Sequence, residues 1–166
     1  MKPTIAALSL GGNVGDTRAA FVKALSMLAA APGVAVVARS SVWRTPPWGK
    51  TDQPDFLNMA ALVETSLSAR ALLDLCLSVE RELGRARAER WGPRVIDIDI
   101  VDYGGMTINE RNLVLPHPRA TGRAFVLAPL AEIAPTLQIA RDCVANHLAR
   151  VGQGDAQRLG PLADVG

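Results

Sequence analysis

Apolar residues alternate between short strand-like runs and helical patterns through the N-terminal part of the chain. The runs rich in β-branched and other apolar residues predict four strands, at 4–10, 34–43, 59–65 and 95–101. An apolar position every three to four residues predicts one helix that begins at Asp16 or Thr17 and another over 68–84. The resulting order β-α-β-β-α-β predicts an α+β fold, with a ferredoxin-like sheet and helices packed on it.

The remainder of the chain carries weaker patterns. Short strands are predicted at 106–109 and 112–116, and helices over 122–135 and 141–151. We expect a single domain over residues 1–151, because 166 residues suit one core and no repeat divides them. The polar, glycine-containing segment 152–166 is expected to form a frayed tail.

The last of the four strands carries two aspartates among β-branched residues. Alternation places Asp97 and Asp99 on one face and Ile96, Ile98 and Ile100 on the other. At ~7 Å the two carboxylates repel each other by roughly 2 kcal/mol at an effective dielectric constant near 20. Three interpretations fit this pair: a solvated face of an edge strand, a general acid–base pair, or a site for a divalent cation.

A long loop over 85–94 precedes this strand and is rich in arginine. All but three of the 18 basic residues of the chain are arginine, and four of them lie in this loop: Arg85, Arg87, Arg90 and Arg94. The guanidinium fork suits phosphate. Because Mg²⁺ is usually held by one or two carboxylates together with substrate phosphates, the loop favours the cation interpretation. His117, close to Arg119 and Arg123, is either a structural residue or a further phosphate donor.

A second long loop, over 44–58, contains three prolines. Trp48 and Phe56 offer flat apolar surfaces, and Asn58 carries a donor and an acceptor that can read the edge of a heterocycle. Packing explains each of these residues taken alone. Their occurrence together on one long loop favours a small-molecule pocket.

Composition narrows the classes of function. A net charge of +2 is too small to indicate nucleic acid, and the few aromatic residues argue against an RNA-binding sheet. Cys76 and Cys143 match no metal or redox spacing and are expected to be reduced. No P-loop occurs, and "LGGNVGD" is interpreted as a tight turn. The first apolar run is too short for a signal peptide and no transmembrane segment follows, so we expect a cytoplasmic protein without a membrane partner.

Four segments give the chain a specific resemblance. They are "SLGGNVGD", "SSVWRTPPWGKTDQPDFLNMAALVET", "GRARAERWGPRVIDIDIVDYGG" and "LVLPHPRATGRAFVLAPLAEIAP", in this order along the chain. They resemble the successive signatures of the 6-hydroxymethyl-7,8-dihydropterin pyrophosphokinase family of folate biosynthesis. The resemblance implies a Mg²⁺-dependent enzyme that transfers the diphosphate of ATP to the hydroxymethyl oxygen of 6-hydroxymethyl-7,8-dihydropterin and releases AMP.

The resemblance also implies roles for individual residues. Asp97 and Asp99 match ligands of two Mg²⁺ ions that bridge the ATP phosphates, and Arg85 and Arg94 match residues that act with them in catalysis. Contacts with ATP are implied for Arg87, Arg90, Trp91, Ile100, His117 and Arg123. Contacts with the pterin are implied for Thr45, Pro46, Pro47, Phe56, Asn58 and Phe125, with the two phenylalanines stacked on the bicycle. Glu80 matches an acid to which we assign no role.

Two positions depart from the family pattern. Gly12 stands where serine is common, and Trp48 stands where a smaller apolar residue is common and would narrow or cap the pterin site. The chain resembles the stand-alone form of the family, and we expect a monomer. An RNA-binding ferredoxin-like domain and an inactive regulatory relative are the alternatives. The intact aspartate and arginine motifs argue against the inactive relative, and aspartates on a central strand would repel a phosphate backbone.

Overall fold

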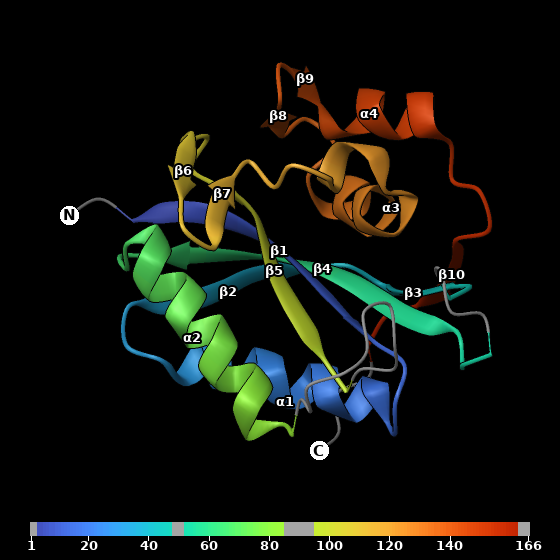
Figure 1. Cartoon of the computed structure of the whole chain (residues 1–166), viewed down its shortest axis with the longest axis horizontal. Coiled ribbons are helices and arrows are strands. Elements are labelled where there is room, and N and C mark those ends of the chain that lie inside the picture. The colour runs from blue at the N-terminus through green and yellow to red at the C-terminus, as the bar shows by residue number, and fades with distance from the viewer. Residues whose placement is uncertain (1–2, 48–51, 85–94, 163–166) are drawn as a thin grey trace.

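The computed structural model describes residues 3–47, 52–84 and 95–162. Helices and antiparallel strands alternate along these ranges (Figure 1) in the following order: β1 (Thr4–Gly12), α1 (Thr17–Ala30), β2 (Val34–Arg39), β3 (Val42–Thr45), β4 (Phe56–Thr65), α2 (Ala69–Glu82), β5 (Asp97–Tyr103), β6 (Ile108–Glu110), β7 (Leu113–Leu115), the 3-10 turn η1 (Ala120–Gly122), α3 (Ala124–Ile133), β8 (Gln138–Ile139), β9 (Asp142–Cys143), α4 (Val144–Val151) and β10 (Gln157–Gly160). The expected α+β class is confirmed. None of the helices in the described ranges combines the length and apolar character needed to cross a membrane.

The main sheet consists of antiparallel pairs. Its order is β10-β3-β4-β1-β5, and β2 also pairs with β4. β1 lies between β4 and β5, so that Leu10 is opposite Met59 on one side and Ile98 on the other. β5 is therefore an edge strand in the described part of the chain, and its outward backbone groups must find partners other than a strand.

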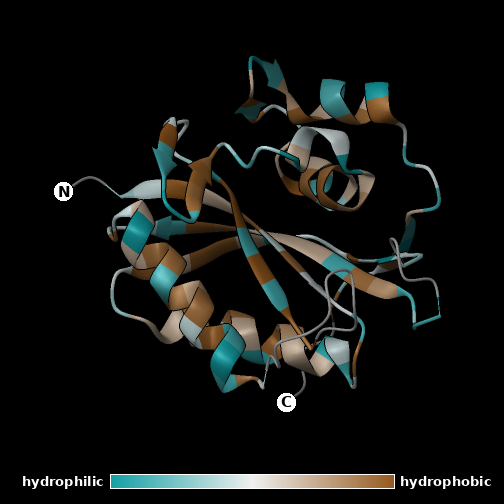
Figure 2. Cartoon of the chain, viewed as in Figure 1, coloured by the Kyte–Doolittle hydropathy of each residue, from teal (hydrophilic) through white to brown (hydrophobic). Residues whose placement is uncertain are grey.

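Alternation along the strands divides the apolar side chains between two faces. Leu8 and Leu10 of β1 share a buried cluster with Phe21 of α1, whereas Ala7 belongs to a second cluster with Leu127 of α3. Figure 1 shows α1 and α2 on one face of the sheet and α3 and α4 on the other, and hydrophobic residues recur along the central strands in Figure 2. Each fully buried Leu or Phe contributes ~1.5–3 kcal/mol, which holds both helical layers against the sheet.

Side-chain caps define where the first two helices begin. Asp16 Oδ1 accepts a hydrogen bond from the Ala19 amide at 3.1 Å. Ser68 Oγ accepts one from the Ala71 amide, also at 3.1 Å. These bonds satisfy backbone donors that have no partner within the helix. The predicted start of the first helix at Asp16 or Thr17 is confirmed.

The single strand predicted over 34–43 is wrong, because the chain breaks it at two serines. Ser40 Oγ donates to the Ser41 carbonyl at 2.7 Å and accepts from the Ala60 amide at 2.8 Å. The Ser41 amide and hydroxyl donate to Glu132 Oε2 at 2.9 and 2.8 Å. The Ser40 amide still donates to the Ala60 carbonyl at 2.9 Å, and the side-chain bonds of the two serines interrupt the regular ladder between β2 and β3. The strands β3 and β4 then extend into the loop expected over 44–58.

The expectation of a frayed tail after Val151 is also wrong for residues up to Leu162. β10 pairs with β3, placing Arg158 opposite Trp43. Ala156 is buried with Trp43 and Ala128 on the α3 side, and Leu162 is buried in the cluster on the α1 side. The C-terminal segment therefore passes around the β3 side of the sheet and packs at both faces. Because β10 and β3 lie far apart in the sequence, no local pattern of residues predicts that they pair.

Candidate active site

Two aspartates project from β5 at the edge of the sheet. Asp97 is half-buried and Asp99 is exposed, while Ile98 and Ile100 are buried on the opposite face against the α1–α2 core. The predicted division of the two strand faces is confirmed. Alternate side chains on one strand face can present their carboxylate oxygens to one bound group.

This pair fits a magnesium ion that shares its coordination with phosphate. Carboxylates are hard oxygen ligands, and Mg²⁺ is commonly bound by one or two of them plus phosphate oxygens and water. Within residues 3–47, 52–84 and 95–162, no group of three or more His, Cys, Asp or Glu side chains could hold a metal ion. In those ranges Asp97 and Asp99 therefore form an open donor set and not a closed protein cage.

A buried glutamate from α2 supports the strand between the two aspartates. The Ile98 amide donates to Glu80 Oε2 at 2.8 Å, and Glu80 is only 4% exposed. Because Ile98 N–H points away from β1 at the sheet edge, this carboxylate takes the place of a strand acceptor. Sequence reasoning assigned Glu80 no role. An acid four residues after Cys76 on the buried face of α2 is the signal that could have found it.

The carboxylates of this region affect the pKa of the neighbouring Cys76 thiol. Burial raises the pKa of Cys76 to about 12, and the nearby charges of Glu80 and Asp99 add to the rise. The carboxylates of Glu80 on α2 and Asp99 on β5 thus both act on the Cys76 thiol. A cation placed beside β5 would lie in a negative field.

A cavity of about 170 Å³ lies beside the aspartate strand. We call it the β5 cavity; its lining includes Asp99, Ile100 and His117, together with residues of α2 and β7. The structure therefore brings together three residues that the resemblance assigned to the metal and to ATP. The apolar side of Ile100 and the polar groups of Asp99 and His117 meet in one hollow, as a nucleotide requires.

His117 is held in a defined orientation in the β5 cavity. Its amide donates to the Val101 carbonyl at 2.8 Å, and its Nδ1 accepts from the Arg119 amide at 3.2 Å. Burial lowers the pKa of His117; Asp99 opposes the change, while Arg123 and Arg119 reinforce it. A neutral imidazole that accepts at Nδ1 carries its proton on Nε2, which can then donate to a phosphate oxygen.

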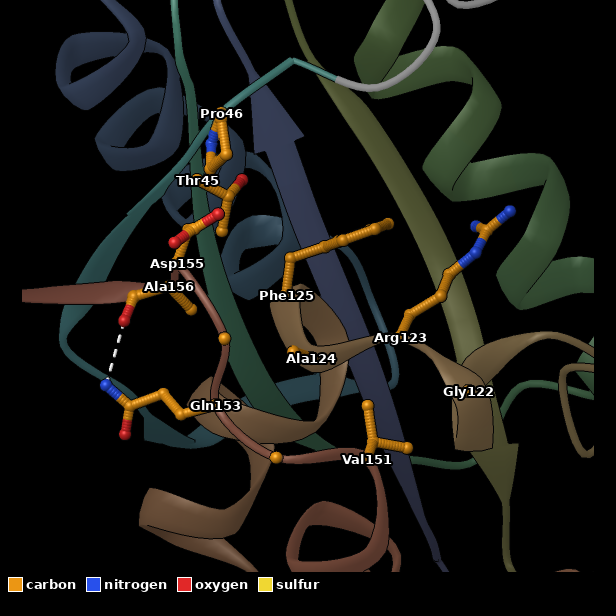
Figure 3. A pocket seen from close by; sticks show the side chains of 12 residues that line it. Thr45, Pro46, Gly122, Arg123, Ala124, Phe125, Val151, Gln153, Asp155 and Ala156 are labelled. Carbon is orange, nitrogen blue, oxygen red and sulfur yellow. Dashed lines mark hydrogen bonds between the residues drawn. The ribbon is translucent and has the colours of Figure 1, made fainter.

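A second cavity, of about 260 Å³, lies beside Phe125. We call it the Phe125 cavity; Figure 3 shows Thr45 and Pro46 on one side, Arg123 and Phe125 at the start of α3, and residues 151–156 closing another side. Thr45, Pro46 and Phe125 are three of the residues assigned to the pterin. The ring of Phe125 gives the cavity a flat apolar wall suited to a planar ligand.

The other predicted pterin residues lie around this cavity unequally. Asn58 is buried and its Nδ2 donates to Thr45 Oγ1 at 2.8 Å, so it orients a lining side chain. Phe56 pairs with Thr45 across β3 and β4. Pro47 follows the lining residue Pro46 and is half-buried. Among the described residues, Pro47, Phe56 and Asn58 adjoin the cavity but do not line it.

Arg123 lines the Phe125 cavity, and its charge acts on groups of the β5 cavity. Its guanidinium carbon lies 5.4 Å from the centroid of the Phe125 ring. Burial lowers the pKa of Arg123 and Arg119 lowers it further, while Asp99 of the β5 cavity raises it. The group remains a cation at neutral pH and interacts with both sides of the site.

Gly12 occupies a position where a side chain would not fit. A Cβ built on Gly12 would lie 2.4 Å from the Val95 carbonyl oxygen, in the segment that leads into β5. The departure from serine at this position therefore accompanies a close approach of two backbones. The other departure, Trp48, lies outside the described residues.

The arginine-loop residues cannot be placed in this geometry. Five predicted site residues lie outside the described ranges: Arg85, Arg87, Arg90, Trp91 and Arg94. The described part of the site consists of the aspartate strand, the segment from His117 to Phe125, the end of β3 and the residues that follow α4. The molecule is thus an α+β protein in which Asp99 and His117 line one cavity and Arg123 lines another.

Sequence comparison identifies the family. Residues 7–135 match the family model described as 7,8-dihydro-6-hydroxymethylpterin-pyrophosphokinase. A "2-amino-4-hydroxy-6-hydroxymethyldihydropteridine pyrophosphokinase" of Methylorubrum extorquens is 51% identical over 156 residues, covering 94% of this chain and 99% of the relative. A protein of the same name from Bacillus subtilis is 46% identical over 129 residues, covering 78% of this chain and 77% of the relative. The chain belongs to the 7,8-dihydro-6-hydroxymethylpterin-pyrophosphokinase family, and the resemblance drawn from the motifs is confirmed.

Solved structures support the fold. A structure described as HPPK-DHPS in complex with substrates matches with a TM-score of 0.76 at 12% identity, covering 95% of this chain and 47% of the other. Plasmodium falciparum HPPK-DHPS with pteroate matches with a TM-score of 0.75 at 14% identity, covering 95% and 46%. This chain spans about half the length of those chains. At such low identity the likeness shows the fold alone.

Proposed function

We propose that this protein transfers the diphosphate group of ATP to the hydroxymethyl oxygen of 6-hydroxymethyl-7,8-dihydropterin and releases AMP. Family membership supports this reaction. The observation that carries it is Arg123, which lines the Phe125 cavity and interacts with Asp99 and His117 of the β5 cavity. A cation that lines one cavity and acts on charged groups of the other is suited to a phosphoryl chain that would pass from one substrate to the other.

The β5 cavity is the proposed ATP site. Ile100 would lie beside the adenine, and His117 Nε2–H and the Arg123 guanidinium would donate to phosphate oxygens. Asp97 and Asp99 would hold two Mg²⁺ ions, which neutralise phosphate charge when bound. Glu80 would keep the two carboxylates in register through its bond to Ile98. Dependence on Mg²⁺ is part of this proposal.

The Phe125 cavity is the proposed pterin site. Phe125 would stack on one face of the bicycle. The other face is assigned to Phe56 by the resemblance, since Phe56 adjoins the cavity without lining it. Thr45 and Asn58 would bind its polar edge, and Pro46 and Pro47 would shape the rim. Holding the pterin alcohol in line with the β-phosphorus would supply much of the rate, because the reaction needs positioning and charge neutralisation more than covalent catalysis.

The roles of the arginine loop rest on the resemblance. We propose that Arg85 and Arg94 stabilise charge on the transferred group. Arg87, Arg90 and Trp91 would contact ATP. All five residues lie outside the described ranges, so their supporting argument is the suitability of a guanidinium fork for phosphate oxygens.

Broader proposals accompany the reaction. The strand order around β1 and the pairing of β2 and β3 with β4 support a ferredoxin-like arrangement of the elements from β1 to β5. The chain would form one domain, with β10 joined to it. We further propose a monomer in the cytoplasm that binds the two small substrates and neither nucleic acid nor membranes.

The identity of the nucleotide product tests the reaction. Incubation with Mg·ATP and 6-hydroxymethyl-7,8-dihydropterin is expected to yield one AMP for each pterin diphosphate, measured by chromatographic separation. Attack at the β-phosphorus makes AMP the leaving group, whereas an ordinary kinase attacks the γ-phosphorus and leaves ADP. ADP as the main product would overturn the assigned reaction. Omission of the pterin provides the control for simple ATP hydrolysis.

A further inference from the structure

The central strand β1 passes beside both aspartates of β5. Ser9 lies opposite Asp99, and Gly11 lies opposite Asp97. Residues paired directly across a ladder point to the same face of a sheet, with their Cβ atoms ~4.5–5.5 Å apart. The side chain of Ser9 therefore lies next to that of Asp99, on the face that the two aspartates share.

The buried clusters show which face of the sheet this is. Ala7 and Ala60 belong to the cluster that includes Leu127 of α3, whereas Leu8 belongs to the cluster on the α1–α2 side. Ser9 follows Leu8 in β1 and lies opposite Ala60 in β4, so its side chain points to the α3 side. It is the one polar side chain that β1 places on this face.

The Ser9 hydroxyl is open to a ligand although the residue is largely buried. Ser9 is only 8% exposed. Within residues 3–47, 52–84 and 95–162, its Oγ has no hydrogen-bond partner, and no fully enclosed side-chain nitrogen or oxygen atom lacks one. Ser9 Oγ is therefore not fully enclosed, and the small exposed part of the residue includes its hydroxyl. Such a hydroxyl can accept a hydrogen bond from outside the protein.

Small residues leave room above this hydroxyl. Ala60 lies opposite Ser9 on the β4 side, and Ala7 and Gly11 are its neighbours on the same face of β1. Gly11 has no side chain to extend over the surface between β4 and β5. Of the four residues next to Ser9 along and across the strands, Asp99 alone has a polar side chain. The hydroxyl and this carboxylate are thus the polar groups of a small open patch.

A hydrated cation beside Asp99 would give the hydroxyl a partner. Mg²⁺ binds its oxygen ligands at ~2.0–2.1 Å and keeps several waters when one or two carboxylates hold it. Each of these waters can donate to an oxygen atom ~2.8 Å further away. Ser9, one strand away from Asp99, is within reach of such a water. Without it, the hydroxyl adds nothing to folding, because it makes no hydrogen bond with the described part of the protein.

We propose that Ser9 is a positioning residue of the metal site, and that its hydroxyl accepts a hydrogen bond from a water bound to the Mg²⁺ ion that Asp99 holds. The inference rests on the proposed function, which assigns Mg²⁺ to the aspartate pair. It extends the metal site from β5 to the neighbouring central strand. Residues that bond to the ligands of a metal, and not to the metal itself, commonly change its affinity about ten-fold or more.

Binding of Mn²⁺ alone to the full chain, measured by electron paramagnetic resonance, tests this role. Ser9→Ala is expected to weaken Mn²⁺ binding about ten-fold, because the metal-bound water loses its acceptor. Ser9→Thr keeps the hydroxyl and should bind within about two-fold of wild type. Two control variants should bind Mn²⁺ as wild type does: Ser26→Ala, at an exposed serine of α1, and Asp74→Asn, at an exposed aspartate of α2.

The thermal unfolding midpoint separates this role from a structural one. Ser9→Ala should keep the wild-type midpoint, because it loses no hydrogen bond within the protein; a clearly lower midpoint would overturn the proposal. Equal Mn²⁺ affinity in wild type and Ser9→Ala would overturn it too, as would equal losses in Ser9→Ala and Ser9→Thr. A wild type that binds no Mn²⁺ would remove the aspartate site together with this contact. A wild type that shows the expected Mn²⁺ pattern but forms no AMP would remove the reaction and leave the contact standing.

Discussion

The β5 cavity and the Phe125 cavity are assembled in different ways. The first takes most of its chemical groups from one stretch of chain, from Asp99 to His117. The second combines the end of β3, the start of α3 and residues 151–156 at the end of α4 and beyond it. Groups that come from one stretch keep their relation through local geometry, whereas a wall built from three distant segments depends on tertiary contacts. We therefore expect the loss of a charged side chain to have the larger effect on activity at the β5 cavity, and the loss of an anchoring contact to have the larger effect at the Phe125 cavity.

The largest effect is expected at the aspartates of β5. Asp97→Asn or Asp99→Asn should lower turnover by about two to three orders of magnitude, because a neutral amide is a poor ligand for Mg²⁺ and leaves phosphate charge uncompensated. Turnover during a Mg²⁺ titration, together with the thermal unfolding midpoint, measures this. Asp74→Asn should leave both unchanged. Normal turnover of either β5 variant at limiting Mg²⁺ would refute the metal assignment.

A smaller effect is expected at Glu80, which touches the strand and not the proposed ligands. Glu80→Ala should lower metal-dependent activity about ten- to hundred-fold, since residues that orient metal ligands carry effects of this size. It should also destabilise the protein by about 1–3 kcal/mol by leaving the buried Ile98 amide without this acceptor.

Glu80→Gln separates the hydrogen bond from the charge. The glutamine carbonyl can still accept from Ile98, so most of the stability lost in Glu80→Ala should return. Mn²⁺ binding to the protein without substrates, measured by electron paramagnetic resonance, reports on the aspartate pair apart from turnover. If the Glu80→Gln and Glu80→Ala variants bind Mn²⁺ with equally low affinity, the charge of Glu80 matters more for metal binding than its hydrogen bond to Ile98.

The smallest effect on turnover is expected at Glu132, which anchors the strand leading to the Phe125 cavity. Burial raises the pKa of Glu132, but hydrogen bonds from the Ser41 side chain and amide and from Trp43, with the charge of Arg158, lower it below its ordinary value of 4.5 overall. A depressed folded-state pKa contributes stability above about pH 4.5 that is lost as the pH falls through the folded value. Glu132→Gln should therefore show a flatter acid unfolding curve than wild type.

A denaturant series at several pH values checks this prediction. Glu64→Gln, at an exposed glutamate of β4, is the matched control. It should follow the wild-type curve. Equal slopes for wild type and Glu132→Gln between about pH 5 and pH 3 would show that the anchoring carboxylate does not govern acid stability.

Local pattern was sufficient for the parts of the fold that are fixed locally. Period-two alternation placed Asp97 and Asp99 opposite Ile98, and this is confirmed because the apolar face must meet the α1–α2 core. The first helix begins at its predicted cap because Asp16 and Ala19 are near neighbours in the chain. The motifs identified the family because its chemistry is concentrated in a few short stretches.

Distant contacts account for what the sequence did not reveal. Ser40 and Ser41 lie in an apolar run that is typical of one strand, and the break depends on Ala60 and Glu132 elsewhere in the chain. Residues 152–162 have the composition of a loose tail, yet β10 within them pairs with β3. Glu80 lay within a recognised pattern, but its role became visible only with the Ile98 amide beside it. The assignments to Arg85, Arg87, Arg90, Trp91 and Arg94 remain predictions.

The burial of Cys76 beside Glu80 and Asp99 has a practical consequence for thiol chemistry. Burial raises its pKa to about 12, so Cys76 is almost entirely the thiol at pH 8, whereas the thiolate is the form that reacts with alkylating reagents. Cys143 is only partly buried, so a maleimide should label it first. Cys76 should then react only when α2 separates from the sheet. The slow second labelling step would time local opening behind the aspartate strand without any added probe.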